Sequence, residues 1–359
     1  MKNKYIMLAF SVLALAVMAI PGIVSVCTFE KDIYSNYLQG DSISAHTSAF
    51  DQYFKDKFFG RSFFYRTNSY IKRSYLNISS KPQKVITGKD GWLFLGNSFE
   101  NVLHESLGYR YFTKDQIAKV QIKLINYKEW LNERGIKFYC SIAPNKHTIY
   151  PEYLPYTQSG LPRQLEQLKM QLEVENNFTL IDLRGHLLPE KGKQRLFKKT
   201  DTHWNDFGAF YASKLLLENI QADFPEVPVW GLDDFSQDSI VSFHQDLSDM
   251  LRLPIKESNI KLSFIDTCAQ KVEKQLIAFR PKQSERGYYE KRFKCKKRNL
   301  KLVMLRDSFG SAMLPFLANA FGESLFIWDT AFDKELIERE QPDVVVLEII
   351  ERHLEHWAR

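Results

Sequence analysis

Short apolar segments alternate with amphipathic helical patterns along most of the chain, and this alternation constrains the fold more than any other feature. The strand candidates are residues 136–142, 178–183, 300–305, 325–328 and 344–349. The helical patterns between and around them cover residues 113–134, 162–176, 205–220, 310–321 and 333–340. Apolar strands separated by helices are typical of a parallel sheet that is covered on both faces. We therefore expect an α/β fold with a mainly parallel sheet.

Two stretches depart from this alternation. Residues 28–82 show a helical pattern with aromatic side chains at helical spacing, and we expect a helical N-terminal segment there. The α/β domain then covers residues 83–359, and it opens with a hairpin over residues 85–94 whose turn is marked by Asp90 and Gly91. Residues 229–299 interrupt the alternation, so we expect an insertion around them.

The N-terminus contains a long apolar segment. Residues 5–26 are 22 consecutive residues without a charge. A helix of this length spans about 33 Å at about 1.5 Å per residue, enough for a hydrocarbon core of about 30 Å. Lys2 and Lys4 precede the segment, which places the N-terminus in the cytoplasm. We expect residues 1–27 to be a transmembrane signal anchor, with the catalytic body extracytoplasmic, in the periplasm or at the cell surface.

Two other interpretations of this segment remain open. A cleaved signal peptide would need a small-residue site, and the available one, Ala14-Leu15-Ala16, lies inside the apolar run. Lipidation of Cys27 would need a small residue before it, where the chain has Val26. All three alternatives export the body. In an oxidising compartment Cys268 and Cys295 could form a disulfide.

The charge of the chain is concentrated in one place. The chain has 49 Lys and Arg against 43 Asp and Glu, a net charge of +6. Residues 280–298 alone contain nine Lys and Arg and two Glu. Nucleic acid is not expected as a partner outside the cytoplasm, whereas an anionic polysaccharide or phospholipid headgroups would suit this stretch. Candidate polysaccharide-binding residues are Arg286, Lys291 and Arg292; the alternative is a solvated hairpin without a ligand.

A candidate nucleophile follows the strand candidate of residues 300–305. Ser308 lies between this strand and a helix, on a turn at the carboxyl edge of the expected sheet, where ligands bind in open α/β folds. The free backbone N–H groups at the start of that helix could hold a developing oxyanion. The alternative is that Asp307 and Ser308 only cap the helix.

A candidate base precedes the helical pattern of residues 205–220. A serine hydroxyl needs a base that takes its proton, and a third group must orient that base. Asp201 and His203 are two residues apart, so on an extended segment both side chains point to the same side. Asn205 is then expected to be the N-cap of the helix. A structural histidine beside a capping turn is the alternative, and His244 with Asp246 is a competing pair of the same kind.

The motifs of other chemistries are missing from the sequence. It contains no H-E-x-x-H, no C-x-x-C and no EF-hand loop, so we expect no dedicated metal site. It also contains no G-x-G-x-x-G and no Walker loop, so we expect no cofactor.

Six blocks then occur in a characteristic order. They are GKDGWLF (88–94), APNKHTIYPEYLP (143–155), DTHWN (201–205), DLSDML (246–251), RDSFG (306–310) and PDVVVLEIIER (342–352). Together they resemble the alginate O-acetyltransferase family of AlgJ/AlgX type, whose catalytic domain is SGNH-hydrolase-like. The resemblance implies a three-layer α/β/α body in which Ser308 is the nucleophile, His203 the general base and Asp201 its orienting carboxylate.

The chain differs from ordinary SGNH hydrolases in two respects. Its D-x-H block precedes the serine block, which is the permuted order of the acetyltransferase family. Arg306 stands where a G-D-S-F block has glycine, so the turn before Ser308 is expected to differ. The oxyanion side chain is not identified by a motif, and Asn145 is a candidate only by its position in a loop.

The resemblance implies a membrane-anchored O-acetyltransferase that acts on an exported polysaccharide through an acetyl-serine. It also implies a partner, a membrane-bound O-acyltransferase that supplies the acetyl groups. Two other functions remain open, an acetyl-esterase with the same triad and a non-catalytic scaffold of a polysaccharide secretion complex. Transfer and hydrolysis differ in whether the cleft excludes water, which the sequence does not reveal.

Overall fold

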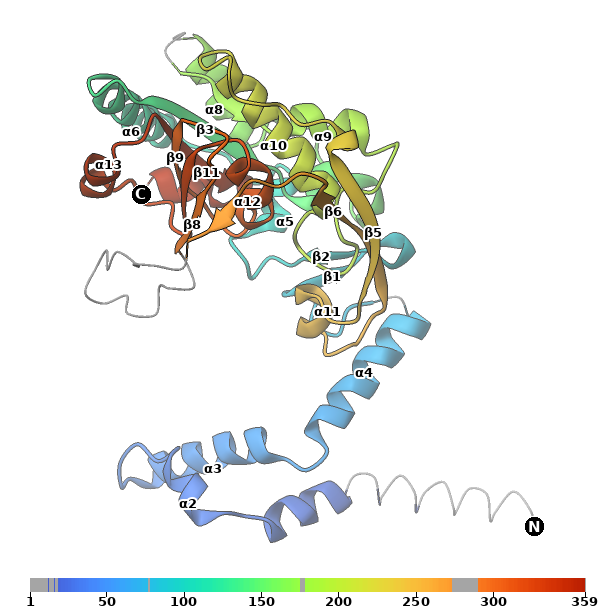
Figure 1. Ribbon diagram of the computed structural model, residues 1–359. Helices are drawn as coiled ribbons and strands as arrows, with labels where there is room; N and C mark the ends of the chain where they lie inside the picture. The colour runs from blue at the N-terminus through green and yellow to red at the C-terminus, as the bar shows by residue number, and fades with distance from the viewer. Residues whose placement is uncertain are drawn as a thin grey trace. The chain divides into compact units, whose positions relative to one another are not determined.

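The computed structural model describes residues 12, 16, 19–76, 78–174, 178–272 and 290–358. The chain divides into two units, residues 1–76 and residues 77–359 (Figure 1). Most of the expected transmembrane anchor of residues 1–27 lies outside the described residues. In the part of the chain that is described, no helix is both long enough and apolar enough to cross a membrane.

The first unit is helical. Residues 19–27 are helical, and α2 (Lys31–Ser35), α3 (Ile43–Lys57) and α4 (Arg61–Leu76) follow them. Ser42 caps α3, because its hydroxyl accepts a hydrogen bond from the amide of Ala45 at 3.1 Å. The unit has a small aromatic core around Tyr53, whose ring centroid lies 4.9 Å from that of Phe29 and 6.0 Å from that of Tyr34.

The second unit is built on a seven-stranded sheet with the order β4-β3-β11-β9-β10-β8-β7. The strands are β3 (Lys137–Ala143), β4 (Leu180–Asp182), β7 (Gln270–Lys271), β8 (Glu290–Lys294), β9 (Lys301–Leu305), β10 (Glu323–Ile327) and β11 (Val344–Ile350). The five strands from β4 to β10 are parallel, whereas β8 and β7 extend the sheet antiparallel. The sheet is therefore mixed. The expectation of a mainly parallel sheet holds for its centre, and the antiparallel edge comes from the stretch 229–299.

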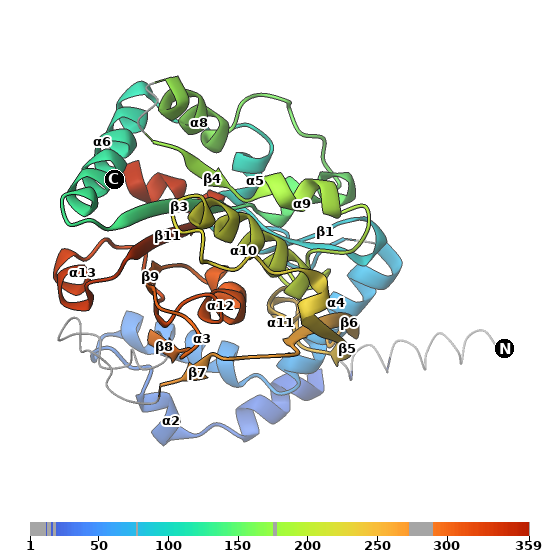
Figure 2. The same ribbon diagram turned by 45° about the horizontal axis from the view of Figure 1, so that its top comes forward.

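Helices cover both faces of this sheet, which gives the expected three layers (Figure 2). One face carries α6 (Lys114–Asn132), α8 (Gln164–Val174), α13 (Lys334–Glu340) and a C-terminal 3-10 helix (Glu351–Ala358). The other carries α9 (Arg184–Glu190), α10 (Asp206–Gln221) and α12 (Gly310–Ala318). Side chains of β11 alternate between the faces, Val344 and Val346 on the second and Val345 and Leu347 on the first. All four are buried, as a central parallel strand requires.

Smaller elements surround the sheet. They are β1 (Val85–Thr87), β2 (Leu93–Leu95), α5 (Val102–Ser106), α7 (Lys146–Ile149), β5 (Phe235–Ser242), α11 (Asp246–Met250) and β6 (Glu257–Phe264). The predicted hairpin is present: β1 and β2 pair antiparallel. Asp90 and Gly91 both have positive φ in the connecting turn. The stretch 229–299 supplies a second hairpin, β5–β6, with α11 in its connection, and Cys268 and Cys295 form a disulfide.

The carboxyl ends of the parallel strands place the site. β9 ends at Leu305, and α12 begins at Gly310, so Ser308 lies on the turn between them. β3 and β11 end at Ala143 and Ile350 at the same edge, because both run parallel within the same sheet. This edge is where open α/β sheets bind their ligands.

Candidate active site

Three side chains from two distant parts of the sequence form a chain of hydrogen bonds. His203 Nε2 lies 2.9 Å from Ser308 Oγ, and His203 Nδ1 lies 2.7 Å from Asp201 Oδ1. The same Asp201 oxygen accepts the backbone amide of His203 at 2.9 Å. Burial opposes ionisation of Asp201, but the hydrogen bond from His203 and the charge of Lys198 outweigh it, so the pKa of Asp201 lies well below its ordinary value. The carboxylate therefore stays charged beside the imidazole.

The loop that carries Asp201 and His203 is closed like a hairpin. Phe197 and Trp204 pair in an isolated antiparallel bridge, and the amide of Lys198 donates to the carbonyl of His203 at 3.3 Å. Asn205 then caps α10 as predicted, with its side chain accepting from the amide of Gly208 at 3.1 Å. The Asp201 and His203 side chains thus meet on the bend of a fixed loop.

Trp204 attaches this loop to the serine turn. Its indole Nε1 donates to the carbonyl of Phe309 at 3.2 Å, and its ring meets that of Phe309 edge-on with centroids 5.0 Å apart. The imidazole of His203 also contacts the Phe309 ring, at 4.9 Å between centroids. Trp204 and Phe309 are almost fully buried, so the contact fixes the distance between His203 and Ser308.

Two backbone amides of the turn that carries Ser308 donate hydrogen bonds to carboxylates. Phe309 N donates to Asp307 Oδ1 at 2.8 Å, and Gly310 N donates to Glu348 Oε2 at 3.1 Å. Both amides were expected to be free for an oxyanion, and this expectation is wrong for them because buried acids satisfy them first. The amide of Ser308 has no hydrogen-bond acceptor within the described residues, which makes it the remaining backbone donor of this turn.

Glu348 is an unexpected part of the site. It lies in the apolar strand β11, is fully buried, and also accepts the amide of Asp307 at 3.2 Å. Burial and the charge of Asp307 raise the pKa of Glu348. A charged residue within an otherwise apolar strand was the sequence signal that could have identified it.

The turn also depends on Gly310 and Arg306. A Cβ on Gly310 would lie 2.7 Å from Glu348 Oε2 and 2.8 Å from Arg306 Cβ, so only glycine fits between them. Arg306 is buried, and its guanidinium donates to the carbonyl of Asp307 at 2.8 Å and to Ser311 Oγ at 2.6 Å. The residue that departs from the G-D-S-F pattern therefore braces the turn.

Lys146 holds the loop of residues 197–204, the base loop, through its backbone carbonyls. Its ammonium group donates to the carbonyl oxygens of Lys198 at 3.0 Å, Lys199 at 3.2 Å and Asp201 at 2.5 Å. The side chain is almost fully buried, and this burial lowers the pKa of Lys146 to about 7. Sequence reasoning left its role open, because three carbonyl contacts leave no trace in a motif.

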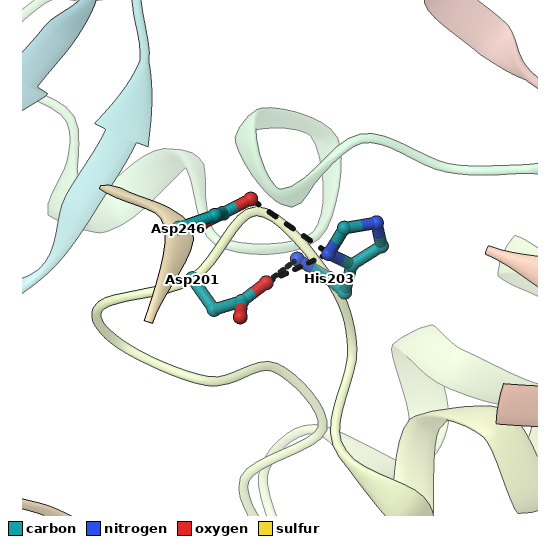
Figure 3. A group of neighbouring side chains, drawn as sticks. All are labelled: Asp201, His203 and Asp246. Carbon is teal, nitrogen blue, oxygen red and sulfur yellow. Dashed lines mark hydrogen bonds and ion pairs between the residues drawn. The ribbon is translucent and has the colours of Figure 1, made fainter. Parts of the chain in front are cut away.

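A second carboxylate reaches His203 from α11. Figure 3 shows the side chains of Asp201 and Asp246 both directed toward the imidazole. Asp246 Oδ2 lies 3.8 Å from His203 Nδ1, and the carboxylate accepts hydrogen bonds from both the hydroxyl and the amide of Thr202. Burial and the charge of Asp201 raise the pKa of Asp246. Asp246 was missed as a site residue and was considered only as the partner of His244, which instead pairs with Asp249 at 2.9 Å.

These three side chains could also hold a metal ion. Donor atoms of Asp201, His203 and Asp246 all lie within 4.8 Å of one another. However, His203 already bonds Asp201 and Ser308 through its two ring nitrogens, and Asp246 bonds Thr202. A bound ion would have to displace at least one of these contacts, so the geometry suits a hydrogen-bonded triad better than a metal centre. The sequence-based expectation of no metal and no cofactor stays a prediction.

A cavity of about 400 Å³ adjoins Ser308 and His203. Its wall includes the cationic residues Lys198, Lys291 and Arg306 and the indole ring of Trp328. Burial and the nearby charges of Arg306 and Lys271 lower the pKa of Lys291. The cavity is thus positively charged around the candidate nucleophile.

The three predicted polysaccharide-binding residues lie in different settings. Lys291 lines the cavity. Arg292 is its neighbour on β8 and points to the other side, where it pairs with Glu290 at 2.8 Å and Glu340 at 2.7 Å. Arg286 lies outside the described residues.

Asn145 is buried at the start of α7. Its side-chain oxygen accepts a hydrogen bond from Arg352 at 2.9 Å, and its Nδ2 is buried with no partner in the described part of the chain. The residue does not belong to the cavity wall beside Ser308. Its role as an oxyanion donor stays a prediction.

Comparison with known proteins places the chain in a family. The family described as SGNH hydrolase-like domain, acetyltransferase AlgX, matches residues 85–282, more than half of the chain. The chain belongs to this AlgX family. The matched residues include Asp201, His203 and Asp246; Ser308 lies beyond them, and it is the three-dimensional structure that brings it to His203.

Two relatives of the chain are both named as probable alginate O-acetylases. The chain is 32% identical over 126 residues to the probable alginate O-acetylase AlgJ of Pseudomonas aeruginosa, covering 35% of this chain and 30% of the relative. It is 28% identical over 144 residues to the protein of the same name from Pseudomonas fluorescens, covering 39% and 34%. The match thus spans about a third of each relative's length.

A solved structure supports the same fold. Bacillus cereus PatB1 superposes with a TM-score of 0.55 at 18% identity, and the alignment covers 75% of this chain and 96% of PatB1. At this identity the likeness concerns the fold alone. It agrees with the SGNH-like α/β architecture of the AlgX family.

Proposed function

We propose that this chain is an extracytoplasmic O-acetyltransferase that moves acetyl groups onto a polysaccharide through an acetyl-serine at Ser308. One observation carries the proposal: hydrogen bonds run without interruption from Asp201 through His203 to Ser308, beside a cavity large enough for a sugar. Membership in the AlgX acetyltransferase family and the names of the AlgJ relatives support the direction of the chemistry.

The hydrogen bonds support the following roles in the proposed reaction. His203 Nε2 removes the proton from Ser308 Oγ, which attacks the carbonyl carbon of the acetyl donor. Asp201 holds the imidazole in the tautomer that presents Nε2 as base and stabilises the imidazolium. The imidazolium then protonates the leaving group. In the second half a sugar hydroxyl gives its proton to His203 and attacks the acetyl-serine, and Ser308 leaves with that proton.

We further propose an anionic acceptor. Lys198, Lys291 and Arg306 line the same cavity as Ser308, and the acceptor hydroxyl would approach Ser308 through this cavity. A carboxylate on the sugar would be attracted by these charges, whereas a neutral sugar would gain nothing from them. The alginate in the name of the AlgJ relatives is consistent with such an acceptor.

The proposed location is outside the cytoplasm, with residues 1–27 as the membrane anchor. The uncharged segment 5–26 and the disulfide Cys268–Cys295 support it, since disulfides persist in oxidising compartments. Because cytoplasmic acetyl donors do not reach such a site, we propose that a membrane-bound O-acyltransferase delivers the acetyl group.

Intact mass spectrometry tests the nucleophile. The full chain in detergent is exposed briefly to p-nitrophenyl acetate, beside Ser308→Ala and the matched control Ser311→Ala, whose hydroxyl lines the same cavity. We expect one added acetyl group on the wild type and on Ser311→Ala, and none on Ser308→Ala. An adduct that persists in Ser308→Ala contradicts the assignment.

The acceptor decides between transfer and hydrolysis. Uronate oligosaccharides should discharge the acetyl-serine and become acetylated, whereas release of free acetate alone indicates an esterase. Lys291→Gln should weaken transfer to uronates more than Lys294→Gln, a control on the same strand that pairs with Glu323 instead of lining the cavity. Equal effects of the two substitutions would remove the anionic-acceptor proposal.

A further inference from the structure

Most apolar side chains of helix α4 lie on a different side of its axis from the basic ones, whereas Tyr65 and Leu76 lie on the basic side. At about 100° per residue, Phe63, Phe64, Tyr70, Ile71 and Tyr75 fall within an arc of about 140° that contains no charged residue. The four charged residues of the helix, all cationic, lie outside that arc: Arg61, Arg66, Lys72 and Arg73. A helix of this composition has the pattern of helices that lie at a membrane surface.

The apolar arc of α4 is exposed. The exposed fractions are 65% for Phe63, 56% for Tyr70, 46% for Ile71 and 76% for Tyr75. Single exposed apolar side chains are normal, but four on one face of one helix form a patch that marks a contact surface.

Phe64, at the side of the arc, packs against Phe58 within the unit, but the core of the first unit does not use the four exposed side chains. That core is built from α3 and the segment before it, with Tyr53 and Ala49 almost fully buried. Tyr53 packs against Phe29 and receives a hydrogen bond from the amide of Glu30 at 2.8 Å. The exposed side chains of α4 are therefore available to something outside the unit.

The charge of α4 and its surroundings indicates which kind of partner contacts the apolar arc. Residues 43–76 contain six Lys and Arg and two Asp and Glu, and α4 itself contains no acid. A protein partner could match an apolar arc alone, whereas an apolar arc flanked by cations matches a bilayer surface with anionic headgroups. The uncharged segment 5–26 lies in the same unit. We propose that α4 lies in the interface of a bilayer that contains anionic phospholipids, with Phe63, Tyr70, Ile71 and Tyr75 facing the acyl chains.

A hollow beside α4 agrees with this orientation. Between α3 and α4 a cavity of about 560 Å³ is walled by Phe54, Phe58, Phe64 and Tyr65. Lys55 and Arg61 also line it. Aromatic walls with cations nearby suit the boundary between acyl chains and phosphate groups.

This inference rests on the proposed membrane attachment but not on the chemistry of Ser308. The test uses the full chain reconstituted in vesicles of phosphatidylglycerol and phosphatidylcholine. Cys27→Ser removes the exposed free thiol, and Tyr70→Cys or Ser62→Cys then carries an NBD fluorophore. Ser62 is exposed on the same helix, about 150° from the centre of the apolar arc, and is the matched control.

Lipids with a nitroxide on the acyl chain report depth by quenching. We expect at least twofold stronger quenching at position 70 than at position 62. Replacing phosphatidylglycerol by phosphatidylcholine should reduce the quenching at position 70. Equal quenching at positions 70 and 62 would contradict the proposed orientation of α4. Quenching at position 70 that does not change when phosphatidylglycerol is replaced would contradict the proposed need for anionic phospholipids.

A third outcome identifies another occupant. If position 70 is protected from lipid nitroxides and from aqueous iodide alike, protein covers the arc and the proposal is wrong. Hydrolysis of p-nitrophenyl acetate by the same samples reports the Ser308 chemistry separately, so failure of the proposed function and failure of this inference can be told apart.

Discussion

His203 Nε2 lies 2.9 Å from Ser308 Oγ, although the two residues are 105 positions apart in the chain. The contact joins the loop between α9 and α10 to the carboxyl end of β9. Trp204 and Phe309, the next residue after each partner, pack edge-on with centroids 5.0 Å apart and hold the two segments together. His203 and Ser308 are thus positioned by their own neighbours in sequence, Trp204 and Phe309.

The two carboxylates near His203 should differ in their effect on catalysis. Asp201→Asn should lower kcat for p-nitrophenyl acetate hydrolysis by about 10³-fold or more, because the amide no longer holds the imidazole in the productive tautomer. Asp246→Asn should lower it less than about 10-fold, since Asp246 mainly binds Thr202 and lies 3.8 Å from Nδ1. Equal losses in the two variants would mean that Asp246 is the orienting residue or shares that role.

The five parallel strands and the grouping of Asp201, His203 and Ser308 could be predicted from the sequence because both leave local signals. Apolar runs mark β3, β9, β10 and β11, and the triad residues lie in short blocks. The antiparallel edge of the sheet was not predicted, because β8 reads Glu-Lys-Arg-Phe-Lys and lacks the apolar character of a central strand. β8 lies between β10 and the two-residue edge strand β7 and stays partly exposed, so its side chains can be charged and hydropathy does not separate it from a loop.

Contacts that depend on the register of the sheet or on the closure of a loop could not be predicted from the sequence either. Glu348 reaches the amide of Gly310 only because β11 lies beside β9 in one particular register. Asp246 reaches Thr202 across 44 residues of chain through the position of α11. In both cases the sequence shows the acidic residue, but it does not show which backbone amide that residue binds.

Lys146→Met should loosen the loop that carries Asp201. The substitution removes hydrogen bonds to three backbone carbonyls, so we expect a lower melting temperature and a kcat reduced by about 10-fold. Lys191→Met is the control, because that ammonium group bonds the carbonyl of Ile149 instead of the base loop. A variant with normal kcat would show that the loop holds its shape without Lys146.

The stability difference between wild type and Lys146→Met should depend on pH. The pKa of Lys146 is lowered by burial to about 7, below the ordinary value of about 10.4. Between these values the unfolded chain binds the proton more tightly, so the wild type gains stability as pH rises, by up to about 1.4 kcal/mol per pH unit. Urea unfolding at pH 7 and pH 9 measures this, and a difference that shrinks with rising pH contradicts it.

The Cys268–Cys295 disulfide should stabilise the sheet edge. It closes a loop with a sequence separation of 27 residues, for which the chain-entropy account gives about 3.5 kcal/mol. Replacing both cysteines by serine should lower the free energy of unfolding by that order. Alkylation before and after reduction provides the direct check: two additional labelled thiols are expected after reduction, and equal labelling of both samples would disprove the bridge.

Glu105 should weaken the fold as the pH rises. It is buried on α5, and neither carboxylate oxygen has a hydrogen-bond partner within the described residues. Burial and the charge of Glu351 raise the pKa of Glu105 to about 8. Between its ordinary pKa of about 4.3 and this value the native state binds the proton more tightly, so stability falls as pH rises. The glutamine of Glu105→Gln stays neutral, so the stability of this variant should not fall in the same way as the pH rises.

Glu105 and the neighbouring acid Glu166 have pKa values shifted in opposite directions, so their substitution by glutamine should affect stability in opposite ways. Glu105→Gln should match the wild type near pH 4 and become more stable than it up to pH 8, by at most about 1.4 kcal/mol per pH unit. Glu166→Gln should have the opposite sign and destabilise the protein at neutral pH. Burial opposes the charge of Glu166, but ion pairs with Arg163 and Arg184 outweigh it and lower its pKa. Urea unfolding of the three proteins across this range measures both differences, and a Glu105→Gln variant that is less stable than the wild type at pH 8 would show that the buried carboxylate has a stabilising partner.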